Sequence, residues 1–182
     1  MVIWLTGMSG AGKTTLGKAL CRLIRPAAPV VILDGDVVRA VIADGLGYSE
    51  ADRFIQIGRM SRLARLIAEQ GIVVIVAALY ASDELLAWNR ANLPGYFEVY
   101  VSASPETLVA RDSKGLYERA RRGEVQDVVG LDIPWHAPVT PDLVLDMDRS
   151  ESPDVLARRI MELLPSIAGL ASGETADLGG AR

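Results

Sequence analysis

The stretch "WLTGMSGAGKTTLGKAL", residues 4–20, limits the possible folds of this chain more than any other part of the sequence. An apolar run leads into a glycine-rich segment, and a helical pattern follows. Residues 7–14 match the pattern G-x-x-x-x-G-K-[ST] without a gap. In such a loop the glycines let backbone N–H groups point at an anion, and the start of the helix adds a positive dipole end. The sequence therefore predicts a strand, a phosphate-binding loop and a helix, in that order.

The loop also carries two side chains that favour a nucleoside triphosphate over a simple anion. Lys13 can reach the β- and γ-phosphates, and the Thr14 hydroxyl can ligate Mg²⁺. A chance glycine-rich turn would lack this combination with a preceding strand and a following helix. We therefore expect ATP and Mg²⁺ to bind here. The residues expected to hold ATP are Gly7, Ser9, Gly10, Ala11, Gly12, Lys13, Thr14 and Thr15.

Apolar runs of strand length alternate with helical patterns along the whole chain. The expected strands are Val2–Leu5, Val30–Leu33, Ile72–Ala77, Phe97–Val101 and Leu143–Leu145. The expected helices cover residues 13–25, 36–43, 49–70, 83–92, 105–122 and 152–164. This alternation predicts an α/β fold with a five-stranded parallel sheet and helices on both faces. We expect the third strand to lie beside the first.

Composition limits the class of protein. With 182 residues, half of them apolar, the chain predicts one domain over residues 1–165, followed by a disordered tail over 166–182. No apolar run is long enough to cross a membrane. A net charge of −4 disfavours a nucleic-acid partner, and the single cysteine, Cys21, fits a reducing cytoplasm.

A pair of carboxylates follows the second expected strand, in "VVILDGDVVR". Side chains at the carboxyl end of a parallel strand lie where such sheets bind ligands. One of the two carboxylates can orient Mg²⁺ or its waters, and the other can accept a hydroxyl proton during phosphoryl transfer. Asp34 is expected to act with Thr14 as a metal ligand. Asp34, Asp36 and Lys13 form the expected catalytic set. The alternative is an Asx turn in which either aspartate only caps the next helix.

A basic segment, "RDSKGLYERARRG", covers residues 111–123. Positive charge beside a flexible glycine is typical of a lid that closes over phosphates and excludes water. We expect Arg111 to contact ATP and Lys114 to lie on the lid, next to Gly115. The alternative, a solvated helix face, applies most directly to Arg119, Arg121 and Arg122.

Two functional classes remain open at this point. A GTPase switch would need a guanine-reading Asn-Lys-x-Asp, and that tetrapeptide is absent. A regulatory nucleotide-binding module would hydrolyse ATP to drive a partner's switch. A kinase for a small acceptor is favoured instead by the paired carboxylates and the basic segment.

Several motifs in order resemble those of adenylylsulfate kinases across residues 2–147. They are "GMSGAGKTT", "LDGDVVR", "GYSEADR", "RDSKGLYERARRGE" and "VVGLDIPWHAPVTPDLVL". The resemblance implies a P-loop kinase fold, a homodimer, and Mg-ATP-dependent phosphorylation of the ribose 3′-hydroxyl of adenosine 5′-phosphosulfate. It also implies roles for individual residues. Asp36 would be the base or metal organiser, Arg39 and Arg53 would grip the anionic group of the acceptor, and Lys114, Gly115 and Leu116 would belong to the lid.

The chain departs from the family pattern on the acceptor side. Gln56 replaces a substrate-facing asparagine, Gly58 replaces an arginine, Ala78 replaces a stacking phenylalanine, and Asp83 replaces a second arginine. Gln56 and Ala78 are still expected to contact the acceptor. Loss of a ring and of positive charge would alter recognition of an adenine and a sulfate.

One further segment, "WNRANLPGYFEVYV" at residues 88–101, resembles a branch of the family that acts on cytidine diphosphoramidate. Cytidine diphosphoramidate is therefore the alternative acceptor. The other interpretation of this segment is drift in a surface helix with the substrate unchanged.

Overall fold

A computed structural model of the chain describes residues 1–79, 82–112 and 115–164. Five strands form one sheet in the order β2-β3-β1-β4-β5, and every neighbouring pair is parallel. The strands are β1 (Val2–Thr6), β2 (Val30–Asp34), β3 (Val73–Ala78), β4 (Tyr96–Ser102) and β5 (Leu143–Asp146). The expected parallel sheet, with the third strand beside the first, is confirmed.

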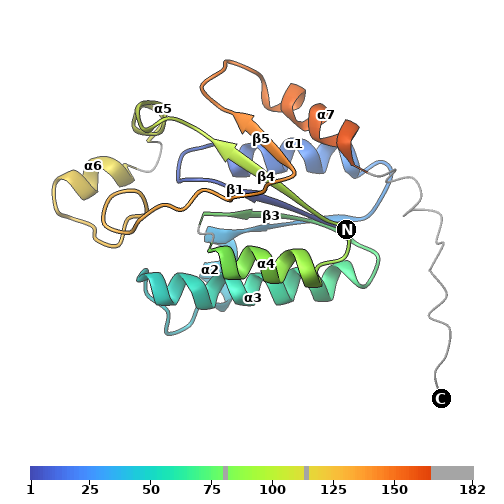
Figure 1. Cartoon of the computed structure of the whole chain (residues 1–182), viewed down its shortest axis with the longest axis horizontal. Helices are drawn as coiled ribbons and strands as arrows, with labels where there is room; N and C mark the ends of the chain where they lie inside the picture. The colour runs from blue at the N-terminus through green and yellow to red at the C-terminus, as the bar shows by residue number, and fades with distance from the viewer. Residues whose placement is uncertain (80–81, 113–114, 165–182) are drawn as a thin grey trace.

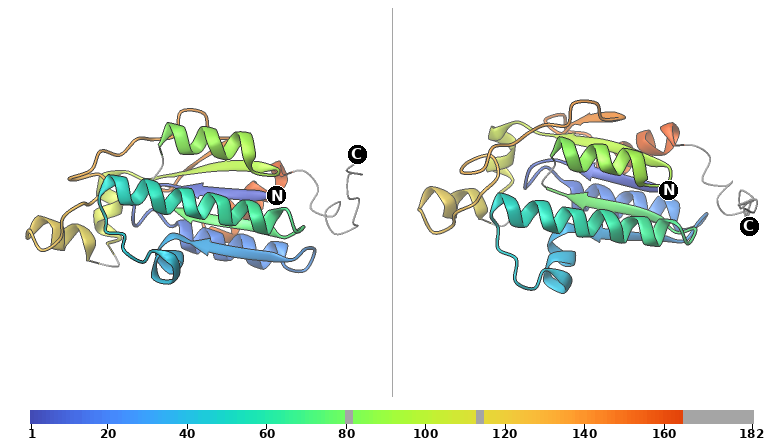
Figure 2. Two further views of the ribbon diagram at one scale, coloured as in Figure 1. Left: turned by 90° about the horizontal axis from the view of Figure 1, so that it is seen from below. Right: turned by 60° about the horizontal axis from the view of Figure 1, so that its bottom comes forward.

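Helices cover both faces of this sheet (Figures 1 and 2). On one face lie α1 (Lys13–Ile24) and α7 (Pro153–Leu163), and on the other α3 (Glu50–Ala68) and α4 (Asp83–Asn92). The shorter helices are α2 (Gly35–Ile42), α5 (Pro105–Ala110) and α6 (Leu116–Arg121). No helix in the described part of the chain is both long enough and apolar enough to span a bilayer.

The central strands have side chains buried on both faces, which explains their unbroken apolar runs. All five residues of β1 and all six of β3 are buried. Ile3 and Leu5 pack in the cluster that includes Leu16 and Ile160, whereas Trp4 packs in the cluster that includes Met60. The sheet thus separates two apolar cores, one under each pair of helices.

The single helix expected over residues 105–122 is wrong, because the structure has two helices there. The Asp112 carboxylate accepts hydrogen bonds from the backbone N–H groups of Leu116, Tyr117 and Glu118, at 2.7, 2.9 and 3.1 Å. Gly115 has φ 61°, in the left-handed region. An N-terminal cap and a left-handed glycine start a new helix, so α5 cannot continue into α6.

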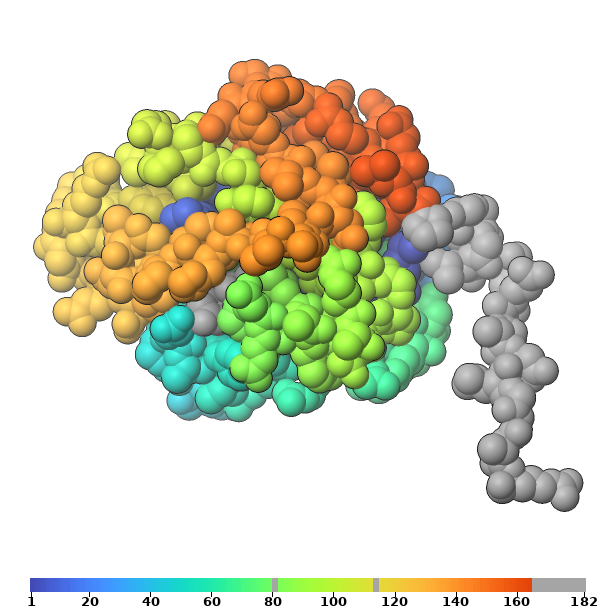
Figure 3. Space-filling model, viewed as in Figure 1, coloured from blue at the N-terminus to red at the C-terminus, as the bar shows by residue number. Residues whose placement is uncertain are grey.

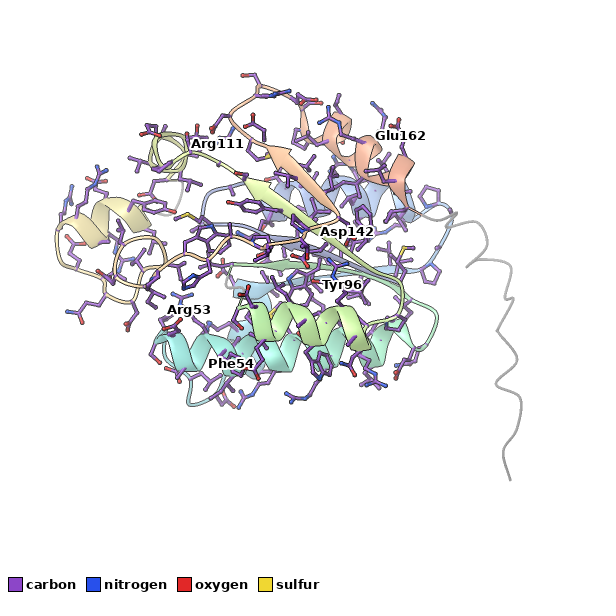
Figure 4. The ribbon with its side chains drawn as sticks, in the orientation of Figure 1. Arg53, Phe54, Tyr96, Arg111, Asp142 and Glu162 are labelled. Atoms are coloured by element: carbon purple, nitrogen blue, oxygen red, sulfur yellow. The ribbon has the colours of Figure 1, made fainter. Side chains whose placement is uncertain are left out.

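A segment of irregular backbone, residues 122–142, connects α6 to β5 and crosses the face of the molecule (Figure 3). It is anchored near β4 by a charged cluster of Arg90, Glu98, Asp142 and Tyr96. Arg90 donates hydrogen bonds to Asp142 at 3.1 Å, to Glu98 at 3.3 Å and to the Thr140 carbonyl at 3.0 Å. Tyr96, at the start of β4, and Asp142, just before β5, are labelled in Figure 4.

Burial raises the pKa of Glu98, whose side chain is 3% exposed, and Arg90 opposes that shift. A carboxyl with a raised folded pKa binds its proton more tightly in the native state, so its ionisation costs stability as pH rises above the usual range. Arg90 offsets that cost while Glu98 is ionised.

We therefore expect Arg90→Ala to lower the free energy of unfolding by about 2 kcal/mol at pH 8, because it removes the cation that hydrogen-bonds the buried Glu98 carboxylate. The loss should be smaller at pH 5, where Glu98 is more fully protonated. Urea denaturation at both pH values measures the difference. Arg65→Ala is the control, since it removes only an exposed i,i+4 pair with Glu69 and should cost below about 0.5 kcal/mol. Equal losses for Arg90→Ala at both pH values would contradict the expectation.

Candidate functional site

The loop after β1 has the backbone geometry that binding phosphates requires. Gly10 and Gly12 have φ of 82° and 103°, values that side chains rarely adopt. A Cβ at Gly7 would lie 2.4 Å from the Val101 carbonyl oxygen of β4, so only glycine lets the loop leave β1 so close to its neighbour. Residue 13 then starts α1, whose N-terminus faces the loop.

A cavity of about 920 Å³ begins at this loop and extends along the carboxyl edge of the sheet. Most of the residues expected from the sequence line it. They are Ser9, Gly10, Gly12, Lys13, Thr14, Thr15, Asp34, Asp36, Arg39, Arg53, Gln56 and Arg111. The structure therefore brings together residues that are far apart in the sequence, from the phosphate loop to the end of α5.

Some of the expected site residues do not line the cavity. Ala11 is fully buried, and its N–H donates to the Met8 carbonyl at 3.2 Å within the loop. Gly7 lies against β4, as described above. Gly115 and Leu116 lie at the start of α6, outside the cavity wall, and Lys114 lies outside the described residues.

Ala78, which was expected to contact the acceptor, does not line the cavity in this structure. Ala78 is fully buried and packs in the core cluster under α3 and α4. Its neighbours Ala77 and Leu79 line the cavity instead. Side chains alternate between the two faces of a strand, so a shift of one residue exchanges a cavity position for a core position.

The phosphate end of the cavity pairs a lysine with a threonine–aspartate couple. The Lys13 ammonium donates to the carbonyl oxygens of Gly7 and Met8, at 2.7 and 2.8 Å. The Thr14 hydroxyl donates to Oδ2 of Asp34. Oδ1 of Asp34 accepts from the Asp36 N–H at 3.0 Å and so caps α2. The Asx-turn interpretation of Asp34 is therefore confirmed, and the same carboxylate still faces the cavity.

This couple fits Mg²⁺. A hydroxyl and a carboxylate are hard oxygen ligands, and Mg²⁺ beside a nucleotide usually takes only one or two protein ligands and completes its shell with phosphates and water. No group of three or more metal-ligating side chains occurs within residues 1–79, 82–112 and 115–164. The Thr14 hydroxyl and the Asp34 carboxylate, which line the cavity together, are oxygen ligands of the kind that Mg²⁺ takes.

The other end of the cavity has two arginines on one aromatic ring. The guanidinium carbons of Arg39 and Arg53 lie 4.6 and 5.6 Å from the centre of the Tyr48 ring. Burial lowers the pKa of Arg53, and the charge of Arg39 lowers it further. Two like charges held together in a partly buried site strongly favour the binding of an anion.

Hydrogen bonds to backbone carbonyls hold these arginines in place. Arg39 donates to Gly47. Arg53 donates to Tyr48 at 2.9 Å and to Asp127 at 2.7 Å, so it joins the start of α3 to the crossing segment 122–142. Arg53 and Arg111 lie on the same side of the molecule, near the ends of the strands (Figure 4). Arg111 donates to the Met147 carbonyl at 2.8 Å.

Gln56 lines the cavity one helical turn after Arg53 on α3, and it is 2% exposed. Neither its amide nitrogen nor its amide oxygen has a hydrogen-bond partner among the described residues. Buried amides are nearly always paired, and each unpaired one costs roughly 1–3 kcal/mol. An unpaired amide on a cavity wall is typical of a group that pairs with a ligand.

Several residues of the cavity wall were not predicted from the sequence. Tyr48 stands in the quoted motif "GYSEADR", but nothing in a single sequence shows that its ring receives two arginines. Met147, Glu151 and Pro153 follow β5 and line the cavity near α1 and Arg111. Their only sequence signal is that they lie in or near the loop after an expected strand, where ligands bind in such sheets.

Comparison with known proteins identifies the family. The sequence model of adenylylsulphate kinases matches residues 1–146. The chain belongs to the adenylylsulfate kinase family. It is 43% identical to an adenylyl-sulfate kinase of Chloroflexus aurantiacus over 157 residues, which cover 86% of this chain and 84% of that relative. It is 42% identical to one of Myxococcus xanthus, over 81% of this chain and 82% of the relative.

Solved structures of the family have the same fold. An APS kinase of Mycobacterium tuberculosis, in complex with AMPPNP and APS, matches with a TM-score of 0.80 and 35% identity, over 88% of this chain and 95% of that one. A shikimate kinase of Aquifex aeolicus, 19% identical with a TM-score of 0.53, shares the fold alone.

The Thr14–Asp34 couple gives a test that separates metal binding from folding. We expect Asp34→Asn to keep the cap of α2, because asparagine caps helices as well as aspartate does, and to change the free energy of unfolding by less than about 0.5 kcal/mol. Loss of the carboxylate should weaken the Mg²⁺-dependent part of ATP binding by roughly tenfold or more. Calorimetric titration with ATP, with and without Mg²⁺, measures both. Asp44→Asn, at an exposed position, is the control, and an unchanged Mg²⁺ dependence in Asp34→Asn would contradict the assignment.

Proposed function

We propose that this protein transfers the γ-phosphoryl group of ATP to the ribose 3′-hydroxyl of adenosine 5′-phosphosulfate, giving ADP and the 3′-phosphorylated nucleotide. The observation that supports this most is one cavity with a phosphate loop at one end and a pair of arginines at the other. The family match over residues 1–146 agrees with it. A pocket of about 920 Å³ is within the usual range for bound ligands of this size.

At the ATP end, Lys13 would leave the two carbonyls that it now contacts and follow the charge of the transferring phosphoryl group. Thr14 and Asp34 would hold Mg²⁺, which neutralises phosphate charge when bound. Arg111 is the predicted contact for the rest of ATP.

At the acceptor end, Arg39 and Arg53 would bind the phosphosulfate, because their clustered charge favours an anion. Gln56 would pair with a polar group of the acceptor. This arrangement would place the ribose between the two ends, beside Asp36.

Asp36 is the proposed base. It stands in the first turn of α2, on the cavity wall and two residues after Asp34. It would accept the proton of the 3′-hydroxyl as that oxygen bonds to the γ-phosphorus and the bond to ADP breaks. The balance of atoms then needs no other reactant.

Three further parts of this proposal follow from the sequence and the family resemblance. Lys114, Gly115 and Leu116 would belong to a lid that closes over the phosphates. The protein would work in the cytoplasm, as a homodimer.

The activity is tested by incubating the protein with Mg-ATP and, in parallel, adenosine 5′-phosphosulfate or cytidine diphosphoramidate. We expect ADP and 3′-phosphorylated adenosine phosphosulfate in equal amounts, with the higher kcat/KM for the adenine compound. Asp36→Asn should bind ATP normally and transfer at most about a hundredth as fast, since general base catalysis contributes about 10²–10⁴-fold.

Each other outcome rejects a different part of the proposal. A tenfold or greater preference for the cytidine compound would change the assigned acceptor and leave the assigned kinase activity unchanged. ADP without a phosphorylated acceptor would favour a regulatory nucleotide-hydrolysing module. Near-normal turnover by Asp36→Asn would remove Asp36 from the role of base.

Gln56 gives an independent test of the acceptor end. We expect Gln56→Met, which keeps the length of the side chain, to raise the KM for the acceptor about tenfold and to leave the KM for ATP unchanged. It should also raise the free energy of unfolding of the free protein by about 1 kcal/mol, because it removes an unpaired buried amide. Steady-state kinetics and urea denaturation measure the two effects. Gln70→Met is the matched control, since Gln70 is exposed just beyond α3 and donates to the Leu66 carbonyl. Unchanged acceptor KM in Gln56→Met would contradict the assigned contact.

A further inference from the structure

A residue of α6, Tyr117, contacts the phosphate loop. The Tyr117 hydroxyl donates to the carbonyl oxygen of Ser9 at 3.0 Å. Tyr117 is 4% exposed and belongs to the core cluster that also contains Ala11, Leu108 and Met147. Burial raises the pKa of this hydroxyl, so it remains a donor across the neutral range.

This hydrogen bond has a consequence for the next N–H group in the loop. A trans peptide is planar, so the carbonyl of Ser9 and the N–H of Gly10 point in opposite directions. No cis peptide bond occurs in the described residues. With the Ser9 carbonyl turned toward α6, the Gly10 N–H points away from α6. Both residues line the cavity, where such N–H groups bind phosphate oxygens.

The position of Tyr117 is itself fixed by Asp112. Its carboxylate accepts from the backbone N–H of Tyr117 and from those of Leu116 and Glu118. Asp112 directly follows Arg111, whose side chain is tied to Met147 on the cavity wall. The loop, α6 and the end of α5 therefore share a continuous set of hydrogen bonds.

We propose that Tyr117, held by Asp112, is a positioning residue for the phosphate loop: its hydroxyl fixes the Ser9–Gly10 peptide with the Gly10 N–H available to the phosphates of the nucleotide. The proposal rests on the nucleotide site of the proposed function. On this proposal, the start of α6 already orients the phosphate loop in the free protein, before a lid closes over the phosphates.

The test compares ADP with adenosine, which lacks phosphates, as ligands in calorimetric titrations. Tyr117→Phe keeps the ring and removes only the hydroxyl. We expect it to raise the Kd for ADP about threefold to tenfold, the usual effect of one neutral hydrogen bond, and to leave the Kd for adenosine unchanged. Tyr96→Phe is the matched control, because it removes a partly buried hydroxyl bonded to Glu98 at the amino end of β4. It should lower the Tm without changing either Kd.

A second variant tests the link to Asp112. Asp112→Ala leaves three N–H groups at the start of α6 without their acceptor, so it should weaken ADP binding in the same direction. Removing the Tyr117 hydroxyl should then cost less in this background than in the wild type. Full additivity would overturn the link.

Three results with Tyr117→Phe would overturn the proposal, and one result with the wild type would reject the nucleotide site itself. An ADP Kd within twofold of the wild type in Tyr117→Phe would overturn the proposal, and so would an equal loss for adenosine or a loss explained by a large drop in Tm. Failure of the wild type to bind ADP at all would reject the nucleotide site, and with it the proposed function.

Discussion

The close approach of Gly7 to the Val101 carbonyl is the constraint on which the rest of the site depends. β1 is the central strand, and it ends beside β4 with no room for a Cβ at the first residue of the loop. The loop can therefore turn over the end of the sheet and deliver its N–H groups to the cavity. The same turn places Lys13 at the start of α1, where the helix dipole and the ammonium act on the same phosphates. A parallel sheet brings Asp34 to this edge as well, since the strands end together.

The two ends of the cavity carry charges of opposite sign, a carboxylate at one end and two guanidinium groups at the other. At the phosphate end, Asp34 contributes negative charge beside a loop that attracts anions. A Mg²⁺ ion bound there would reduce the repulsion between this carboxylate and the phosphates. At the other end, Arg39 and Arg53 repel one another across a single ring, and an anion would relieve that repulsion. The pKa of Arg53 is lowered by burial and by Arg39, so the free protein carries an electrostatic cost that a negatively charged acceptor removes. Binding at either end thus neutralises charges that the fold has already brought together.

Much of the fold and of the phosphate end could be predicted from the sequence, because both depend on local patterns. Unbroken apolar runs gave the strands, and a gap-free motif gave the loop. The break between α5 and α6 was missed because it depends on Asp112 capping a helix that begins four residues later. The expectation that Ala78 contacts the acceptor came from its position in the family motif. A motif position fixes where a residue stands in the chain, but the direction of its side chain depends on the register of β3 against β1 and β2. The contact of Tyr117 with Ser9 joins residues distant in the chain, and the stacking of Arg39 and Arg53 on Tyr48 depends on how α2, the following loop and α3 fold together. One sequence carries no signal for either contact.

The departures from the family pattern fall on the acceptor side, and the structure gives them unequal weight. Ala78 is part of a core, so the missing ring at that position changes packing under α3 and α4 rather than the cavity wall. Gln56 is different, because its amide is buried on the wall without a partner. A site that presents an unpaired buried amide penalises any ligand that fails to pair with it, and such sites discriminate far more strongly than apolar pockets do. In the proposed function, the phosphate loop would hold the transferred phosphoryl group and Asp36 would accept the hydroxyl proton, whichever acceptor is bound. On that proposal, selectivity would depend on the polar match at Gln56 and on the charge match at the two arginines, and it could change there without disturbing the residues proposed for phosphoryl transfer.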